Sequence, residues 1–368
     1  MPVEMIGWVT PRVSSEIIPP DGPPFDPAVI AETARLHERG GFDRVLIGYY
    51  SHAPDGFLIT AHAAASTTTL KFLLAHRPGF VAPTLAARKL ATLDQLSGGR
   101  LAVHIIAGGS DADQARDGDH TDHAARYRRA SEYVDVMRRT WTATAPFDHT
   151  GEFYQIEGAH SEIRCRQTPH IPVYGGGGSD DAINALAPHL DVFMLWGEPL
   201  KETAAFMQRV CAAAATFGKT PAFSLSTRPI LADTEAKAWD RARDILGRIT
   251  SLQKVGLQKS GPPQPENAGS LRLLKAAAEA DVHDTCLWAR IAVATGARGN
   301  STALVGTPDT VAAALLAYYK LGATSLLVRG YDPVPDTEQY GRELIPRVRA
   351  LVAEYDRSQS STTSGTSR

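Results

Sequence analysis

Short apolar runs alternate with longer amphipathic segments along the chain. The runs are nearly continuous in apolar residues, as expected of strands that are covered on both faces of a parallel sheet. Some of the longer segments open on Pro and close on Gly, which are typical start and stop signals of helices. The predicted strands are Met5–Thr10, Arg44–Tyr49, Lys71–His76, Leu101–Ala107, Pro172–Gly176, Val192–Gly197, Phe223–Leu231 and Ser325–Gly330.

Helical patterns fill most of the intervals between these strands. Eight strands with interleaved helices predict an α/β protein, a closed (β/α)8 TIM barrel. An open doubly wound sheet is the alternative, but a chain of 368 residues with that fold usually shows a domain break, and no linker-like stretch divides this one. The predicted helices are Pro27–Gly40, Pro83–Ser97, Asp122–Thr142, Ser179–Leu190, Leu200–Gly218 and Thr307–Gly322.

Two stretches interrupt the alternation, and both are predicted to be insertions at the carboxyl-terminal face of the barrel. Residues 145–170 contain GEFYQIEG, which predicts a small hairpin. Residues 250–306 form a longer irregular excursion of the kind that supplies lids. Residues 1–357 are predicted to be one domain, and the Ser/Thr-rich residues 358–368 a disordered tail.

Composition excludes several classes of protein. Hydrophobic residues make up 43% of the chain and charged residues 21%, which is enough apolar material for a folded core. The formal net charge of −2 argues against binding nucleic acid or an anionic membrane through bulk charge. The chain has three cysteines without a CxxC pair, no signal-peptide pattern and no apolar run of membrane-spanning length. These features favour a cytoplasmic protein.

The sharpest local motif is the glycine run Gly175–Gly178, which is followed by Ser179. The run follows a predicted strand and opens a predicted helix, where free backbone N–H groups and the helix dipole favour an anion such as a phosphate. A plain turn with Ser179 or Asp180 as the helix N-cap explains the same residues. Asp180 and Asp181 would repel a phosphate if their side chains pointed inward, so the residues alone leave both interpretations open.

A second glycine site, Ala107–Ser110, ends the fourth predicted strand at the expected catalytic face of the barrel. The acidic loop that follows contains His120 and His123. These residues could belong to a metal cluster, but Thr121 or Asp122 as the N-cap of the next helix explains them better. No metal site is predicted.

Further polar and aromatic residues lie at predicted strand ends or in the excursion. Trp196 and Tyr331 supply an indole and a phenol, and Arg228, Arg298 and Arg329 supply guanidiniums. Guanidiniums bind oxyanions through a planar fork of donors, so the pattern predicts a barrel with an anion-binding mouth. The alternative is that Arg298 and Arg329 are ordinary surface charges.

Several blocks of the sequence together resemble the bacterial luciferase-like superfamily, and within it the two-component alkanesulfonate monooxygenases. The resemblance covers nearly the whole chain apart from the tail, and the order and spacing of its blocks are specific for the superfamily rather than for one substrate. The matching blocks are RPGFVAPTLAARKLATLDQL with SGGRLAVHIIAGG (77–109), RYRRASEY (126–133), VYGGGGSDDAINALAPHLDVFMLWGEP (173–199) and STALVGTPDTVAAALLAYYKLGATSLLVRGY (301–331).

This resemblance implies a barrel that binds reduced FMN as a cosubstrate, delivered by a separate NAD(P)H:FMN reductase. The enzyme would use O2 to cleave the carbon–sulfur bond of an organosulfonate, with release of sulfite and an aldehyde, and it would be a dimer or tetramer. The family's flavin site maps onto Ala107, Gly108, Tyr127, Gly177, Gly178 and Ser179, and its catalytic positions map onto Trp196, Arg298 and Tyr331.

Departures from the family pattern cluster in the substrate pocket. The family's pocket cysteine is Ala53, its strand-seven Arg and His are Ser226 and Arg228, and the His after the tyrosine is Pro333. Arg228 could restore the missing guanidinium, because positions 226 and 228 face the same side of a strand. We therefore hypothesise flavin chemistry on a different, anionic substrate. The alternatives are oxygenation of a sulfone, an amine or a carbon centre, deazaflavin-dependent hydride transfer, and a non-catalytic flavin-binding barrel.

Overall fold

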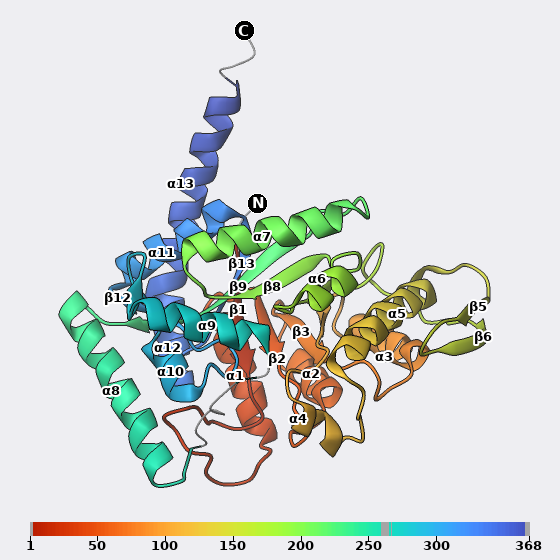
Figure 1. Ribbon diagram of the computed structural model, residues 1–368, viewed down its shortest axis with the longest axis horizontal. Coiled ribbons are helices and arrows are strands. Elements are labelled where there is room, and N and C mark those ends of the chain that lie inside the picture. The colour runs from red at the N-terminus through yellow and green to blue at the C-terminus, as the bar shows by residue number, and fades with distance from the viewer. Residues whose placement is uncertain (1–2, 259–264, 266, 365–368) are drawn as a thin grey trace.

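The computed structural model describes residues 3–258, 265 and 267–364, and its centre is a closed barrel of parallel strands (Figure 1). All eight predicted strands are present and pair in the described chain, so the barrel prediction is confirmed and the open sheet is wrong. Pairing of the first strand with the last closes the barrel, with Glu4 opposite Ser325. In barrel order the strands are β1 (Glu4–Val9), β2 (Arg44–Ile47), β3 (Lys71–His76), β4 (Leu101–Ile105), β7 (Val173–Gly175), β8 (Val192–Trp196), β9 (Ala222–Leu231) and β13 (Ala323–Val328).

Helices surround the barrel, and all six predicted helices are present, with shorter ends in some cases. Helix α2 is not among the predicted helices, because it is apolar on nearly every side and therefore lacks an amphipathic pattern. The helices outside the large excursion are α1 (Pro27–Arg39), α2 (Gly56–Ala65), α3 (Pro83–Leu96), α4 (Asp111–Arg116), α5 (His123–Thr142), α6 (Asp180–Leu186), α7 (Leu200–Ala215), α11 (Pro308–Leu321), α12 (Pro333–Gln339), the π-helical turn η1 (Tyr340–Leu344) and α13 (Ile345–Ser364).

The barrel interior is closed at the amino-terminal ends of its strands by a polar cluster. Arg44 Nε donates to Glu4 Oε1 at 3.1 Å, and the hydroxyls of Tyr174 and Ser325 donate to Glu4 Oε2 at 3.1 and 3.0 Å. Apolar side chains such as Leu73 fill the space above this cluster. The face left for a ligand is therefore the carboxyl-terminal one, as in other barrels of this type.

The excursion 250–306 is more regular than predicted and does lie beyond the carboxyl end of a strand. Strand β9 is ten residues long, and its last part, Arg228–Leu231, leaves the barrel to pair with β12. Residues 259–264 and 266 of this excursion lie outside the described residues. The elements of this region are α8 (Glu235–Lys254), α9 (Ala268–Glu279), β10 (Val282–His283), β11 (Leu287–Trp288), α10 (Arg290–Thr295) and β12 (Ala303–Gly306).

The stretch 145–170 does form the predicted hairpin, with β5 (Phe147–Thr150) paired to β6 (Gln155–Ala159). Its place differs from the expected one, because it connects the end of α5 to the start of β7 and packs along α5. The backbone N–H groups of Phe153 and Tyr154 donate to the Glu132 carboxylate of α5, both at 2.9 Å. The hairpin thus stabilises the barrel wall rather than the mouth.

Helix α13 continues through Ser364 into the tail, whose disorder stays a prediction. The hydroxyls of Ser358 and Ser360 donate to the backbone carbonyls of Tyr355 and Asp356, at 2.6 and 2.9 Å, and so add to the helical bonds. Residues 365–368 lie outside the described residues. Within the described part of the chain, no helix is long and apolar enough to cross a membrane.

Candidate functional site

The glycine run forms a tight cradle between β7 and α6. A Cβ atom on Gly177 would lie 2.4 Å from Ala182 Cβ and 2.6 Å from Tyr127 Oη, and one on Gly176 would lie 2.5 Å from the Met194 carbonyl oxygen. The backbone can approach its neighbours this closely only because these residues lack side chains. Ser179 caps α6 by accepting a hydrogen bond from Ala182 N at 3.2 Å, which confirms the N-cap interpretation and leaves its hydroxyl hydrogen able to donate.

The acidic residues after Ser179 do not argue against an anion here. Asp180 is 82% exposed and forms an ion pair with Arg209 of α7, so its charge is directed away from the cradle and neutralised. Asp181 is exposed as well. The structure thus removes the main objection that the sequence raised against a phosphate at this position.

Tyr127 supplies a hydroxyl to the cradle from α5. The ring is buried and packs edge-on against His123, with ring centroids 5.0 Å apart. Burial raises the pKa of Tyr127 to about 12, so the phenol stays protonated at neutral pH. It can therefore donate a hydrogen bond to a ligand at Gly177.

Arg272 reaches the same cradle from the excursion, and sequence reasoning missed it. Its Nη1 donates to the Gly178 carbonyl at 3.0 Å, and its Nε donates to both carboxylate oxygens of Glu198 at 2.9 Å. The guanidinium also lies over the ring of Phe206, 4.5 Å from its centroid. No motif in the sequence marks Arg272, because its importance arises only when α9 packs onto the loop after β7.

The second predicted glycine site is covered by α4. Gly108 has φ +90°, a conformation that favours glycine, and the Gln114 amide lies directly over it and donates to the Ala107 carbonyl at 3.2 Å. Arg77, which is buried at the end of β3, holds α4 through a 2.6 Å ion pair with Asp113. In the structure the backbone of Ala107 and Gly108 therefore contacts Gln114 of α4, and the Arg77–Asp113 ion pair holds this helix in place.

The loop after α4 supports the N-cap interpretation rather than a metal site. Asp122 caps α5 by accepting from Ala125 N at 2.9 Å, and Asp119 forms an ion pair with Arg129. Among the residues that the structure describes, no group of three or more potential ligands could hold a metal ion.

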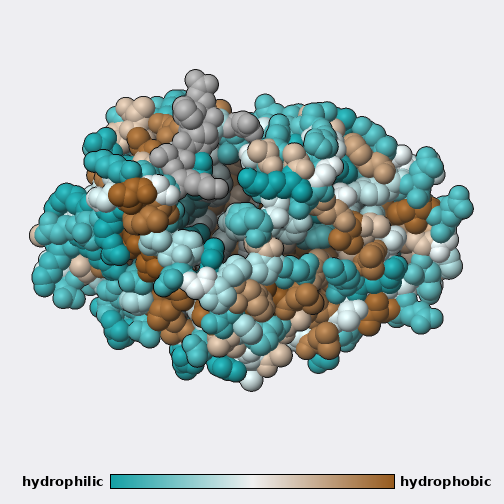
Figure 2. Space-filling view, turned by 90° about the horizontal axis from the view of Figure 1, so that it is seen from below, coloured by the Kyte–Doolittle hydropathy of each residue, from teal (hydrophilic) through white to brown (hydrophobic). Residues whose placement is uncertain are grey.

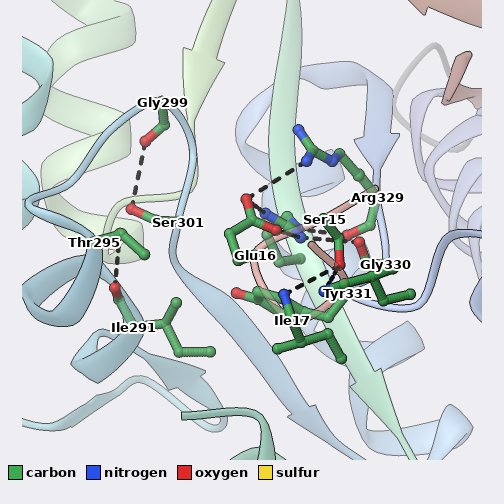
Figure 3. Close-up of polar contacts among 12 residues, drawn as sticks. Ser15, Glu16, Ile17, Ile291, Thr295, Gly299, Ser301, Arg329, Gly330 and Tyr331 are labelled. Carbon is green, nitrogen blue, oxygen red and sulfur yellow. Dashed lines mark hydrogen bonds and ion pairs between the residues drawn. The ribbon is translucent and has the colours of Figure 1, made fainter. Parts of the chain in front are cut away.

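A charge cluster occupies the other side of the mouth. Arg228, which is 2% exposed, donates to Glu16 Oε1 and Oε2 at 3.0 and 2.9 Å and to the carbonyls of Arg329 and Gly330 at 2.8 and 2.9 Å. Arg329 Nη2 lies 3.5 Å from Glu16 Oε1 (Figure 3). Burial favours the neutral form of Glu16, but the two guanidiniums outweigh it and lower its pKa well below the ordinary value.

This cluster changes the role expected for Arg228. The sequence suggested a free guanidinium for a substrate anion, whereas the structure shows a buried ion pair with Glu16. The guanidinium also lies over the ring of Tyr331, 3.9 Å from its centroid. Tyr331 is buried, burial raises its pKa, and its hydroxyl has no hydrogen-bond partner among the described residues. The Arg329 guanidinium lies over the Trp8 ring, 5.0 Å from its centroid, and its side chain is 27% exposed. Arg329 is therefore a more accessible cation than Arg228.

Trp196 and Arg298 meet the excursion in different ways. Trp196 packs against Gly269 of α9, where a Cβ would lie 2.9 Å from Trp196 Cζ3. Arg298 is exposed and has no ion pair or hydrogen bond within the described part of the chain. It follows Ala297, whose carbonyl accepts from the buried Ser270 hydroxyl at 2.7 Å.

The two sides of the site are joined at strand ends on one face. Thr302 links them, because its hydroxyl donates to the Gly197 carbonyl at 2.6 Å and its own carbonyl accepts from Arg228 N at 3.1 Å. Figure 2, which views the molecule from below Figure 1, shows a surface of mixed hydropathy with a hollow near its centre that hydrophilic residues border. Two residues that depart from the family pattern follow barrel strands: Ala53 N donates to Tyr50 O at 3.0 Å in the loop after β2, and Pro333 begins α12 after β13.

Comparison with known proteins gives the same overall picture. Residues 5–325 match the family model described as "Luciferase-like monooxygenase". An EDTA monooxygenase from Chelativorans sp. BNC1 has the same fold, with a TM-score of 0.77 at 18% identity over 95% of this chain and 94% of that chain. A riboflavin lyase solved with modified FMN and riboflavin matches with a TM-score of 0.76 at 18% identity over 95% and 92% of the two chains.

Other solved structures extend the range of relatives. A long-chain alkane monooxygenase matches with a TM-score of 0.74 at 16% identity over 95% of this chain and 92% of that chain. The same fold also occurs in a reductase and a secondary alcohol dehydrogenase that are described as dependent on F420. At these identities each structural likeness shows the fold.

Proposed function

The chain belongs to the luciferase-like monooxygenase family, and on that premise we propose that it is the oxygenase of a two-component flavin system. It takes FMNH2 from a separate NAD(P)H:FMN reductase and uses O2 to oxidise an anionic organic substrate. The observation that carries the proposal is the backbone at Gly177, which only a residue without a side chain can bring this close to the Tyr127 hydroxyl and the start of α6.

The residues that would hold the flavin phosphate are Gly177, Gly178, Ser179 and Tyr127. They offer backbone N–H groups at a helix start, a serine hydroxyl whose hydrogen is free, and a protonated phenol. Ala107 and Gly108 would lie nearer the flavin ring, by the family correspondence. When bound, reduced flavin supplies the two electrons with which O2 is activated toward the substrate.

Organosulfonates are the substrate class that we propose first. In that reaction RCH2SO3⁻, O2 and FMNH2 give RCHO, SO3²⁻, FMN, H2O and one H⁺, so one oxygen atom enters the aldehyde and the other leaves as water. The two arginines and one carboxylate of the Glu16 cluster leave a net positive charge. The partly exposed Arg329 and the exposed Arg298 would bind the sulfonate, and the excursion would keep water from the reacting centre.

Sulfite release tests this proposal. The purified protein, an FMN reductase, NAD(P)H and O2 are incubated with a panel of sulfonates that differ in chain length and polarity. We expect sulfite and aldehyde in equal amounts with at least one member, and none when the reductase is omitted. No sulfite across the panel would rule out desulfonation, and FMNH2 oxidation that no organic substrate stimulates would favour a non-catalytic barrel.

The ion pair between Glu16 and Arg228 favours a second candidate function. Because that guanidinium is already paired, the pocket has less free positive charge than the sequence suggested. The same scaffold could then oxygenate a sulfone, an amine or a carbon centre, or transfer hydride with a reduced deazaflavin. Parallel assays with FMNH2 and with reduced deazaflavin distinguish the cofactors, since only the one that fits will be oxidised faster when substrate is added.

We also propose that the protein forms a homodimer or homotetramer. Two leucines on the outer helices support burial between copies: Leu58 in the first turn of α2 is 72% exposed, and Leu96 at the end of α3 is 74% exposed. Light scattering coupled to size-exclusion chromatography measures the mass directly. A monomer at micromolar concentration would contradict the proposal.

A further inference from the structure

We propose that Arg272 of α9 binds the phosphate group of the cofactor and thereby ties the excursion to the cofactor site. This inference rests on the proposed function, because it assumes that the ligand at the cradle is a phosphomonoester. It adds a charged residue, contributed from outside the barrel, to the backbone and hydroxyl donors already described.

The position of Arg272 at the cradle is the first argument. Its Nη1 contacts the Gly178 carbonyl at 3.0 Å, and a Cβ on Gly178 would lie 2.5 Å from the same nitrogen. The neighbouring cation, Arg209, pairs with the exposed Asp180 of α6, whereas Arg272 contacts the backbone of the loop itself. Arg272 is thus the cation that the described structure places directly against the loop.

The bonding of the guanidinium is the second argument. The buried Glu198 carboxylate accepts from Nε and lies 2.8 Å from Nη2, so it fixes the plane of the fork. A guanidinium has five N–H groups, and N–H groups on both terminal nitrogens remain available to a ligand. The side chain is 29% exposed, so solvent and ligands can reach these donors. Paired donors of this kind suit a phosphate dianion.

The attachments of α9 give the proposal a consequence for the rest of the site. In the first turn of this helix, Gly269 packs on Trp196, and the Ser270 hydroxyl donates to the Ala297 carbonyl at 2.7 Å. A phosphate held by Arg272 therefore holds the helix that positions Trp196 and the segment before Arg298. Riboflavin lacks the phosphate and would not engage Arg272.

The test is an anaerobic titration of the full chain with reduced FMN and with reduced riboflavin, followed by tryptophan fluorescence. Wild type is expected to bind reduced FMN more tightly. Arg272→Gln is expected to weaken FMN binding roughly tenfold, the worth of one charge-assisted hydrogen bond, and to leave riboflavin binding within about twofold of wild type. Arg272→Lys, which keeps the charge but loses the fork, should fall between the two.

A matched control is Arg290→Gln, because Arg290 lies in the same excursion but pairs with Asp281 at 3.4 Å. It should leave the binding of both flavins unchanged. Hydrogen exchange adds a readout: FMN should protect residues 267–272 in wild type and not in Arg272→Gln. If the Gln variant does not fold, the ratio of FMN to riboflavin affinity in the Lys variant decides.

Two outcomes separate the inference from the proposed function. If wild type prefers FMN and Arg272→Gln keeps that preference, or loses affinity for both flavins equally, the role of Arg272 is wrong and the proposed function stands. If wild type binds neither reduced flavin, the proposed function fails and the inference fails with it.

Discussion

At the scale of single residues, Glu16 sets how much positive charge reaches the mouth. The strand-end pattern predicted Arg228 at this face, and the structure places it there, but its pairing with Glu16 could not be predicted. Glu16 lies in an irregular loop after β1, and its two cations, from β9 and from the residue after β13, come more than 200 positions later in the chain. Contacts of that kind leave no periodic signal, so sequence patterns find one partner and miss the other.

The buried ion pair gives a stability prediction. Glu16→Gln leaves the buried Arg228 without its main countercharge, and we expect urea unfolding at pH 7.5 to show a loss of roughly 3 kcal/mol. The control is Glu152→Gln, because the Glu152–Arg128 pair is 54% exposed on both sides. Its loss should be much smaller, because water screens an exposed ion pair. Equal losses in the two variants would mean that burial adds nothing to the Glu16 pair.

Buried histidines predict a dependence of stability on pH. Burial lowers the pKa of His37, His76 and His104 from 6.5 to about 4. Between these values the unfolded chain binds more protons than the folded one, so the free energy of unfolding is full above about pH 6.5 and falls as the pH drops toward 4. Carboxylates with lowered pKa values, such as Glu4, add to the loss only below about pH 4.5.

The measurement is urea unfolding at several values between pH 5 and 7.5. His104→Leu removes one of these histidines, whose Nδ1 is buried without a hydrogen-bond partner among the described residues, and should make the slope shallower over this range. A variant whose stability changes with pH as steeply as wild type would show that His104 does not titrate as inferred.

At the scale of elements, the sequence identified the parts that repeat. Eight strands were predicted because each is buried on both faces and therefore nearly continuous in apolar residues. Strands β10 and β11 have two residues each and β12 has four, too short for a period to show. Helix α9 was missed for another reason: its place over the glycine cradle depends on packing with Trp196 and Gly178 rather than on its own pattern.

The loop between β7 and α6 predicts a specific effect of one methyl group. Gly177→Ala places Cβ 2.4 Å from Ala182 Cβ, so the loop must move, and we expect reduced FMN to bind more than about tenfold more weakly. Gly247→Ala in α8 is the matched control, since its Cβ would meet no atom within 4 Å. It should leave binding unchanged and raise stability slightly, because alanine favours helices. Unchanged FMN affinity in Gly177→Ala would place the phosphate elsewhere.

At the scale of the whole molecule, one face carries every group discussed for the site. The amino-terminal end of the barrel is closed by the Glu4 cluster. The excursion places Arg298 and helix α9, which packs on Trp196, at the opposite end. The family resemblance implied this division between a fixed flavin loop and a variable pocket. The attachment of the excursion to the loop between β7 and α6 through Arg272 comes from the structure alone.

Arg298 tests whether the excursion protects the reaction from water. It is exposed and has no partner within the described part of the chain, so it is available to a bound anion. Arg298→Ala should leave flavin oxidation running but shift its outcome, with more hydrogen peroxide and less product per FMNH2 consumed. Lys275→Ala, in an exposed pair with Glu279, is the control. An unchanged ratio of product to peroxide would remove Arg298 from the mechanism.

The pairing of β1 with β13 has a consequence for synthesis of the protein. Residues 4–6 find their partners only at residues 325–327, so the first strand leaves the ribosome long before its second neighbour exists. During that interval β1 is an edge strand of mostly apolar residues, unpaired on one side, and such an edge can pair with strands of other chains. Barrel closure is therefore a late step, and shortening the chain before β13 should yield an aggregating product rather than a smaller stable barrel.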